Sequence, residues 1–442
     1  MKESFRKFIR DHAEDDLLKL LLNASRYQED VKMAVVQIKA RKQLKDKLPE
    51  WHKNERLIFP STSAAEQCSS ETTAIYKKRL VQQNDWLCDL TGGLGVDTYY
   101  FSQKVKRVTY LEKNKVYCDA AEANFQTLGT ANVHVINGDA IDFLKNKNES
   151  ANGINVFYID PSRRGKDNRR LFAISDCEPN LKEIMDLLPM YYKIIIKLSP
   201  MLDVSQVLKQ IPSVCEVHIL SIKNECKELL LVAESAVPPA QTCNLGALSP
   251  AQICKTSPIT SQFLETDPII FCVNYTGNNA EQSFCFRLSD ERGEVTPTAK
   301  SVHCPPDKAR DGVIVPVGKN MGRFLYEPNA SILKAGAFKS VVLHYGVVKL
   351  HTNSHLYTSN IQVTTFPSRI FEITDILPFN NRICKTISSV IPKANISVRN
   401  FPLVVEEIRK RTRISEGGDI YLFATTLADN QKVLIKCSPL VQ

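Results

Sequence analysis

Apolar and polar residues follow two different periods along the chain. Over residues 1–50 the apolar residues return every three or four positions, and no Gly or Pro occurs before Pro49. This period predicts helices that each bury one face. From about residue 56, apolar runs are separated by polar helical stretches. That alternation predicts βαβ units and a parallel sheet.

The apolar runs of the second region predict its strands. The strand candidates are residues 86–90, 107–112, 133–138, 154–160 and 192–200. Two further apolar runs within residues 215–235 are separated by only a short polar break. Because that break is too short for a helical crossover, the pair predicts an antiparallel hairpin that closes the sheet.

A boundary is predicted at residues 237–242, VPPAQT. Strand-like runs at 267–275 and 283–288 follow it, and then a helix that Asn329 or Ser331 would cap. From residue 368 the pattern is β-α-β-α-β-β, which is typical of a compact α+β module. The expected domains are an N-terminal helical region 1–55, a sheet domain 56–236, an irregular β-rich connecting domain 237–365 and an α+β domain 366–442.

Composition places the chain among ordinary globular proteins. It has 442 residues, 43% of them hydrophobic, and a formal net charge of +9. This charge permits a polyanionic partner such as RNA without requiring one. The 13 cysteines have no Cys-x-x-Cys spacing, the N-terminus has no apolar leader, and no apolar run reaches the ~20 residues of a membrane span. We therefore expect a soluble, cytoplasmic protein with reduced thiols and no membrane partner.

The first candidate for chemistry is the loop DLTGGLGVDT, residues 89–98, which directly follows the first predicted strand. Glycine at 93 and 95 lets the chain turn sharply and lets a ligand approach the backbone. A tight strand-to-helix turn without a ligand has the same requirement. The loop alone does not separate these two interpretations.

Carboxylates end the first four predicted strands: Asp89, Glu112, Asp139 and Asp160. In open α/β sheets, ligands bind at the carboxyl ends of the strands, and an acid in the position of Glu112 can bind both ribose hydroxyls of an adenosine cofactor. Asp139 can accept from an adenine amine. Each acid alone is equally explained as a cap or turn residue, but the set predicts a ligand site.

The residues after Gly95 bear on the type of cofactor. A dinucleotide site expects a third glycine, whereas Val96, Asp97 and Thr98 stand here. A carboxylate at Asp97 would repel a pyrophosphate and suit a sulfonium that carries an amino-acid tail. The hairpin after the fifth strand also disfavours a nicotinamide-binding fold.

Together these motifs resemble a class I S-adenosylmethionine-dependent methyltransferase over residues 60–235. The segment EQCSSETTAIYKKRL, residues 66–80, and GGLGVDTYYFS resemble the RNA cap guanine-N2 methyltransferase relatives. The whole chain is similar to bacterial methyltransferases with a C-terminal THUMP-like domain, an RNA-binding module. The resemblance implies an α/β fold: a Rossmann-like class I methyltransferase sheet with an N-terminal helical cap and a C-terminal α+β THUMP-like module.

The resemblance also implies S-adenosyl-L-methionine as the cofactor. The residues that it implies for cofactor binding are Asp89, Thr91, Gly93 and Gly95 in the loop, Glu112 at the ribose, and Asp139 with Ala140 at the adenine edge. Gln67 and Ser69 would close over the cofactor from the N-terminal side. A helix N-cap by Ser69 or Ser70 is an equally good explanation of that segment.

The motif DPSRR, residues 160–164, corresponds to the Asp-Pro-Pro-aromatic motif of amino methyltransferases in this class. Asp160 and Pro161 match, whereas Arg163 replaces the aromatic ring. Asp160 would orient an acceptor amine, and Arg163 would stack on its base, with Tyr158 and Phe172 as other candidates. Uridine C5 chemistry is rejected, because KLSP (197–200) offers no cysteine nucleophile. Lys197 in this segment ends an apolar strand, and we expect it to pair with a carboxylate.

Arginines and lysines beside this motif predict contacts to phosphate or base: Arg163, Arg164, Lys166, Arg169 and Arg170. A solvated loop is the alternative. The predicted function is S-adenosylmethionine-dependent methylation of a base nitrogen in RNA, without a metal. Two alternatives stay open: a catalytically inactive protein of the same fold that binds cofactor and RNA, and a methyltransferase for a non-RNA substrate.

Overall fold

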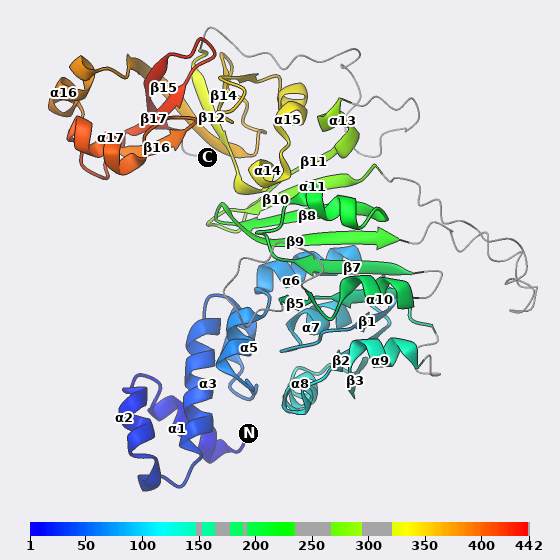
Figure 1. Ribbon diagram of the computed structural model, residues 1–442. Coiled ribbons are helices and arrows are strands. Elements are labelled where there is room, and N and C mark those ends of the chain that lie inside the picture. The colour runs from blue at the N-terminus through cyan, green and yellow to red at the C-terminus, as the bar shows by residue number, and fades with distance from the viewer. Residues whose placement is uncertain (147–152, 164–176, 189–191, 235–266, 294–320, 441–442) are drawn as a thin grey trace, which may run out of the picture. The chain divides into compact units, whose positions relative to one another are not determined.

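Figure 1 shows the computed structural model of the chain. It describes residues 1–146, 153–163, 177–188, 192–234, 267–293 and 321–440. The chain divides into two compact units, residues 1–215 with 228–266, and residues 216–227 with 267–442.

Helices open the first unit, as the apolar period predicts. They are α1 (Glu3–Asp11), α2 (Leu17–Leu22), α3 (Val31–Leu44), α4 (Pro49–Lys53), α5 (Thr62–Gln67) and α6 (Glu71–Lys77), with 3-10 turns η1 (Ala24–Arg26) and η2 (Lys78–Leu80). The carboxylates of Asp16 and Asp30 accept from free backbone N–H groups at the starts of α2 and α3. Ile9, Val35 and Ile38 belong to a core of these helices alone.

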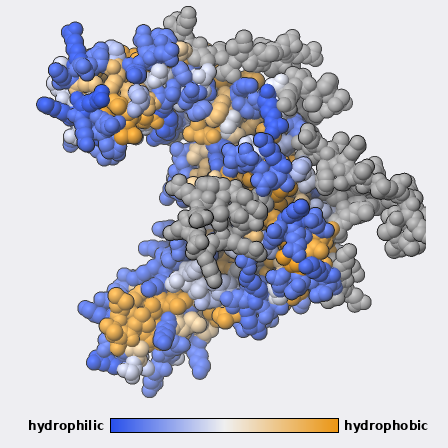
Figure 2. Space-filling model, viewed as in Figure 1, coloured by the Kyte–Doolittle hydropathy of each residue, from blue (hydrophilic) through white to orange (hydrophobic). Residues whose placement is uncertain are grey.

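The surface over these first helices is partly apolar. Figure 2 shows apolar atoms gathered there, and Leu18 and Leu22 of α2 are exposed.

A mostly parallel sheet follows in the first unit. Its strands are β1 (Trp86–Asp89), β2 (Arg107–Glu112), β3 (Val133–Asn137), β4 (Val156–Ile159), β7 (Lys193–Leu198) and β9 (Glu225–Glu234). They run in the order β9-β7-β4-β1-β2-β3. Every pair is parallel except β7 with β9. The predicted parallel sheet and its strand candidates are therefore confirmed.

Helices and a short ribbon connect these strands. They are α7 (Val96–Ser102), α8 (Lys115–Thr127), α9 (Ala140–Lys145), α10 (Leu181–Leu187) and α11 (Val204–Gln210), and the paired strands β5 (Ser162–Arg163) and β6 (Cys177–Glu178). A helix after each parallel strand is the crossover that parallel neighbours require. The parallel strands β1, β2, β3, β4 and β7 consequently end at the same edge of the sheet.

The predicted hairpin is confirmed in one respect and wrong in another. Lys223 and Asn224, both with positive φ, form the two-residue turn between β8 (Val214–Ile222) and β9. The hairpin does not close the sheet, because β10 (Ile269–Tyr275) pairs in parallel with β8 from Glu216 to Ile222. Sequence period alone did not indicate this, since the pairing partner lies far along the chain. Beside β10, β11 (Glu281–Arg287) pairs antiparallel.

The second unit also contains a mixed sheet. Its strands run in the order β13 (Val348–Lys349), β14 (Tyr357–Ser359), β12 (Phe324–Pro328), β15 (Ser368–Pro378), β18 (Lys432–Pro439), β17 (Tyr421–Thr426), β16 (Asn395–Arg399). The accompanying helices are α13 (Leu288–Arg292), α14 (Ala330–Ala335), α15 (Phe338–Tyr345), α16 (Asn381–Val390) and α17 (Val405–Thr412).

The C-terminal β-α-β-α-β-β pattern is confirmed by β15 to β18 and their two helices. Of the two proposed caps, Asn329 accepts from the backbone N–H of Ile332 at 3.1 Å, whereas Ser331 donates its hydroxyl to Asn329. Strand β12 pairs antiparallel with β15, so residues before 368 share a sheet with the C-terminal module.

Candidate functional site

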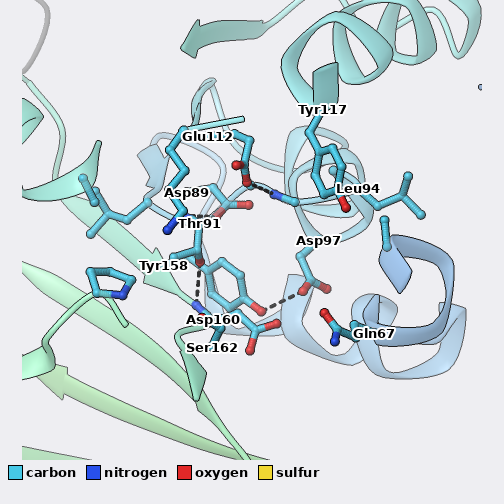
Figure 3. Close-up of a pocket in the computed structure, with 18 of the residues that line it drawn as sticks. Gln67, Asp89, Thr91, Leu94, Asp97, Glu112, Tyr117, Tyr158, Asp160 and Ser162 are labelled. Carbon is cyan, nitrogen blue, oxygen red and sulfur yellow. Dashed lines mark hydrogen bonds between the residues drawn. The ribbon is translucent and has the colours of Figure 1, made fainter. Parts of the chain in front are cut away.

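The carboxyl ends of β1, β2, β3 and β4 border a cavity of about 320 Å³ (Figure 3). Its volume is at the lower end of the roughly 300–1,000 Å³ of small-molecule sites. The residues singled out in the sequence that line it are Asp89, Thr91, Gly93, Gly95, Glu112, Asp139, Ala140, Gln67, Ser69 and Asp160. Residues from four strand ends and from α5 therefore meet at one cavity.

The glycine loop follows β1 and leads into α7. Gly95 begins this helix with φ +83°, and a Cβ there would lie 2.8 Å from the Phe125 ring. A side chain at Gly92 would clash more severely than one at Gly95, because its Cβ would lie 2.1 Å from the Tyr110 ring. Gly92 was not singled out in the sequence, since its requirement arises from packing against β2 and not from its own φ.

Asp89 ties the two ends of the loop together. One carboxylate oxygen accepts from the Thr91 backbone N–H at 3.1 Å, and the other accepts from the Thr98 hydroxyl at 2.6 Å. The side chain is buried, and burial raises the pKa of Asp89 to about 7. These two hydrogen bonds therefore connect the start of the loop to helix α7.

This buried carboxyl predicts a pH-dependent stability. Because the folded pKa of Asp89 is raised above the unfolded value of ~3.9, its stabilising contribution is complete below that value and is lost as pH rises through about 7. Asp89→Asn carries no charge: its amide oxygen can still accept from the Thr91 backbone N–H, and its NH₂ group would donate to the Thr98 hydroxyl oxygen. We expect the free energy of unfolding of the wild type to fall by about 2 kcal/mol relative to this variant between pH 5 and 8.

Urea denaturation of both proteins without ligand, at four pH values in this range, measures that difference. Parallel pH profiles for wild type and variant would contradict a raised pKa at Asp89.

Glu112, at the end of β2, supports the loop from the other side. Its carboxylate accepts from the backbone N–H of Gly93 at 3.0 Å and from that of Asn114 at 2.8 Å, one on each oxygen. A carboxylate has about four lone-pair positions, so each oxygen of Glu112 keeps one for a hydroxyl donor. The residue lines the cavity at the same time.

Asp139 is the N-cap of α9. Its Oδ1 accepts from the backbone N–H of Ile141 at 2.8 Å and from that of Asp142 at 3.3 Å. Its Oδ2 has no hydrogen-bond partner in the part of the chain that the structure describes, and the side chain is exposed. Asp139 therefore combines a capping role with a free acceptor beside the cavity.

Asp97, which the sequence interpretation took as a negative charge beside the ligand, lines the cavity. Its carboxylate accepts from the Tyr158 hydroxyl at 2.7 Å (Figure 3). It also accepts from the Ser69 hydroxyl at 2.7 Å and lies 2.9 Å from the Lys77 ammonium. The buried Lys77 offsets only part of this charge, because it also pairs with Glu228. The two serines are also separated, because Ser70 is the N-cap of α6 whereas Ser69 lines the cavity.

Lys77 is fully buried and has further partners. Its ammonium donates to the Ser69 hydroxyl at 2.7 Å and to the Glu228 carboxylate at 2.8 Å. Nothing in the sequence distinguished Lys77 from the adjacent Lys78, because only the tertiary fold brings Asp97 and Glu228 to its end.

Asp160, at the end of β4, forms an ion pair with Lys197 of β7, with 2.5 Å between Oδ2 and Nζ. The backbone N–H of Asp160 donates to the Thr91 hydroxyl at 2.7 Å. Burial raises the pKa of Asp160, and Lys197 partly offsets this. For Lys197, burial alone would lower the pKa, but Asp160 and Glu228 outweigh it and the pKa is raised. The expected pairing of Lys197 with a carboxylate is confirmed.

The rest of the DPSRR motif is described only in part. Ser162 lines the cavity and Pro161 is half-buried, while the backbone of Arg163 pairs with Cys177 in the β5–β6 ribbon. The Arg163 side chain lies outside the described residues, as do Arg164, Lys166, Arg169, Arg170 and Phe172. Tyr158 is buried, as expected for a core residue.

Other residues of the cavity were not anticipated. They are Ala64, Cys68, Leu94, Lys113, Tyr117, Ile141, Glu178 and Pro179. Tyr117 shares a hydrogen bond of 2.7 Å with Ser61, which precedes α5. Their common signal is position, just after a strand or at a helix start, and this is too general to identify a residue.

Metal ligands and membrane spans were also searched over the described residues. No group of three or more His, Cys, Asp or Glu side chains there could hold a metal ion. Within the same residues, no helix combines the length and the apolar character that crossing a membrane requires.

Two protein families match the C-terminal part. Residues 324–367 match a family described as a ferredoxin-like domain, and residues 368–439 match one described as THUMP domain-like. The first family covers β12 to β14, which share a sheet with the C-terminal module. Sequence reasoning had not recognised this ferredoxin-like domain.

Similarity to a solved structure extends over the whole chain. The crystal structure of a proposed methyltransferase from Porphyromonas gingivalis W83 is 30% identical, with a TM-score of 0.79, and the match covers 99% of this chain and 98% of that one. A Thermotoga maritima protein described as an uncharacterized RNA methyltransferase is 30% identical over 129 residues. That match spans 28% of this chain and 29% of the Thermotoga protein.

Proposed function

The chain belongs to the class I methyltransferases that carry a C-terminal THUMP-like domain, and we propose that it transfers a methyl group from S-adenosylmethionine to a base nitrogen of RNA. The observation that carries the proposal is the meeting of Glu112, Asp139 and Asp160 at one cavity, with the glycine loop as its floor. A cavity with convergent polar groups at the carboxyl ends of parallel strands is the usual ligand site of such sheets.

The side chains present suit an adenosine cofactor. Glu112 retains one lone pair on each oxygen for the two ribose hydroxyls, and Asp139 retains a free oxygen for the adenine amine. The methionine part would lie along residues 91–95, where the backbone is open at Gly93, because a Cβ there would have only the Thr91 carbonyl oxygen within 4 Å. When bound, S-adenosylmethionine supplies an electrophilic methyl group at its sulfonium sulfur.

Asp160 is the proposed catalytic residue at the acceptor. Lys197 holds its Oδ2, and the Thr91 hydroxyl holds its backbone N–H, so the remaining Oδ1 is the oxygen available to an acceptor. Lys197 also favours the ionised carboxylate, which only accepts hydrogen bonds. The acceptor should therefore be an N–H group, whose lone pair Asp160 would direct at the methyl group.

RNA is the proposed substrate for two reasons. The THUMP domain-like family matches residues 368–439, and the resemblance noted in the sequence gives such modules a role in RNA binding. The Thermotoga relative is described as an RNA methyltransferase. The net charge of +9 is compatible with a polyanion.

A single-atom substitution tests the adenine contact. In Asp139→Asn the amide oxygen can still accept from Ile141 N–H and cap α9, but an NH₂ group replaces the free oxygen. Two donors would then face each other at the adenine edge. We expect the affinity for S-adenosylhomocysteine in calorimetric titration to fall about tenfold.

The matched control for this variant is Asp142→Asn, since Asp142 lies in the same helical turn and is not among the residues lining the cavity. Its affinity should match that of the wild type. Equal losses in both variants would point to a general effect on α9 and contradict the contact.

The function itself is tested with the wild-type chain. We expect calorimetric binding of S-adenosylmethionine and S-adenosylhomocysteine, followed by transfer of tritiated methyl groups to total RNA. Absence of binding would overturn the proposal. Binding without transfer to RNA or to a small-molecule pool would favour the inactive protein, for which the departure of DPSRR from the usual motif is the supporting observation. Transfer to another acceptor would exclude RNA.

A further inference from the structure

A second cavity of about 320 Å³ lies among the N-terminal helices, apart from the first one in sequence and in lining residues. Its walls come from α1, α3, α4 and the segments that follow α1 and α4. The residues that line it are Arg6, Ile9, Arg10, Ala13, Glu14, Ile38, Arg41, Lys42, Lys45, His52 and Glu55. None of these residues was singled out in the sequence.

The rim of this cavity is cationic. Arginines and lysines contribute five positive charges to the lining, and Glu14 and Glu55 contribute two negative ones. Glu55 pairs with Arg10, and Glu14 lies 3.4 Å from Lys42. Glu3, which does not line the cavity, pairs with Arg6 and Arg10. The exposed Lys45 has no ion-pair or hydrogen-bond partner among the described residues. The rim therefore has an excess of positive charge that would attract an anion.

Two arginines show that the cation cluster is built into the fold. The Arg41 guanidinium donates to the backbone carbonyl groups of Glu55 at 3.0 Å and Leu57 at 2.9 Å, which fixes its position. The Nε of Arg6 is buried and has no hydrogen-bond partner in the described structure. An unpaired buried donor costs free energy unless a ligand or water pairs with it.

The apolar residues of the lining are Ile9, Ala13 and Ile38, which we call the floor because the two isoleucines are buried. A small inorganic anion would leave this floor without a partner. A nucleotide has a flat base for an apolar floor and a phosphate for a cationic rim. The volume of about 320 Å³ accommodates one such unit.

Helix α3 connects this cavity to the first one. It carries Arg41 and Lys42, and it packs against α5, which carries Gln67 of the cofactor cavity. Just after α3, Lys47 donates to the carbonyl groups of Ala65 and Glu66. The helix that holds the cations is thus fixed to a wall of the proposed catalytic site.

We propose that this second cavity binds one nucleotide of the RNA substrate, with the phosphate at Lys45 and Arg6 and the base on the apolar floor. The proposal rests on the function proposed above, because it assigns a part of the same RNA to the N-terminal helices. A free mononucleotide has the same chemistry, and the experiment separates the two sources.

The test is the binding of a fluorescently labelled single-stranded RNA of twelve nucleotides to the full chain, followed by polarisation over a range of salt concentrations. We expect Lys45→Ala to weaken binding about fivefold and to lower the slope of log affinity against log salt by about 0.7, the value for one phosphate contact. Lys39→Ala is the matched control, since Lys39 is an exposed lysine of α3 that does not line the cavity. It should change neither quantity.

A second variant tests the cavity without changing its charge. Ala13→Phe fills the floor, and we expect weaker RNA binding with an unchanged salt slope. Equal effects of Lys45→Ala and Lys39→Ala, or full affinity in Ala13→Phe, would overturn the proposal. A third outcome would also overturn it: Lys45→Ala weakens the binding of adenosine monophosphate but leaves RNA binding unchanged. The site would then bind a free nucleotide and not the RNA.

Titration with S-adenosylhomocysteine separates this proposal from the proposed function. Loss of cofactor binding with retained Lys45-dependent RNA binding would contradict the methyltransferase activity alone. Normal methyl transfer with RNA binding that does not depend on Lys45 would contradict the nucleotide site alone.

Discussion

Asp160→Asn is expected to lower the rate of methyl transfer to RNA about 10³-fold while the affinity for S-adenosylhomocysteine stays within about threefold of wild type. The amide oxygen of the variant would turn toward the Lys197 ammonium, which only donates. The NH₂ group would then face the acceptor N–H, donor against donor. Initial rates of tritium transfer from S-adenosylmethionine, together with calorimetry on the same proteins, measure both quantities.

A structural role of Asp160 makes a different prediction. If Asp160 served only to neutralise Lys197, the double variant Asp160→Asn, Lys197→Met would recover activity, because no unpaired cation would remain. We expect it to stay as slow as the single variant. Asp142→Asn, in the exposed first turn of α9, should keep the wild-type rate. Recovery in the double variant would remove Asp160 from the catalytic machinery.

Lys77→Met is expected to destabilise the first unit by about 3–5 kcal/mol, the cost of leaving buried charges without their partner. The Lys77 side chain is fully buried, and its removal would leave the carboxylates of Asp97 and Glu228 without their shared cation. Asp97 also accepts from Ser69, which lines the cofactor cavity. The midpoint of urea denaturation, followed by circular dichroism, would report the loss.

Two variants control this result. Lys78→Met changes the next residue, whose ammonium donates to Gln103 at the surface, and should cost no more than about 0.5 kcal/mol. Adding Glu228→Gln to Lys77→Met removes one of the two carboxylates left without a cation. This double variant should recover part of the lost free energy of unfolding. A Lys77→Met midpoint equal to that of Lys78→Met would show that the buried cluster contributes no net stability.

Much of the fold follows from local patterns in the sequence. The apolar period of residues 1–50 predicted the N-terminal helices, and the runs that became β1, β2, β3, β4 and β7 were all recognised. These elements could be found because amphipathic periods and apolar runs are properties of neighbouring residues. The place of β10 beside β8 was missed, since strand pairing depends on residues distant along the chain.

The residues of the site also fall into those that the sequence indicated and those that only the structure identified. Asp89, Glu112, Asp139 and Asp160 were found because each lies at the end of a strand or within two residues after it, and strand ends can be read from the sequence. Lys77 and its ion pair with Asp97 were missed, because the two residues come from different elements. Lys197 was recognised as a partner for a carboxylate, and the structure identifies that carboxylate as Asp160.

The sequence by itself therefore determined the kind of sheet and the strand ends whose carboxylates line the cavity. Only the tertiary structure decided which charges are neutralised and which face the cavity. The physical reason is that a charge is governed by everything within a few ångströms of it, through desolvation and ion pairing. Those neighbours come from α6, β7 and β9, up to 151 residues away along the chain.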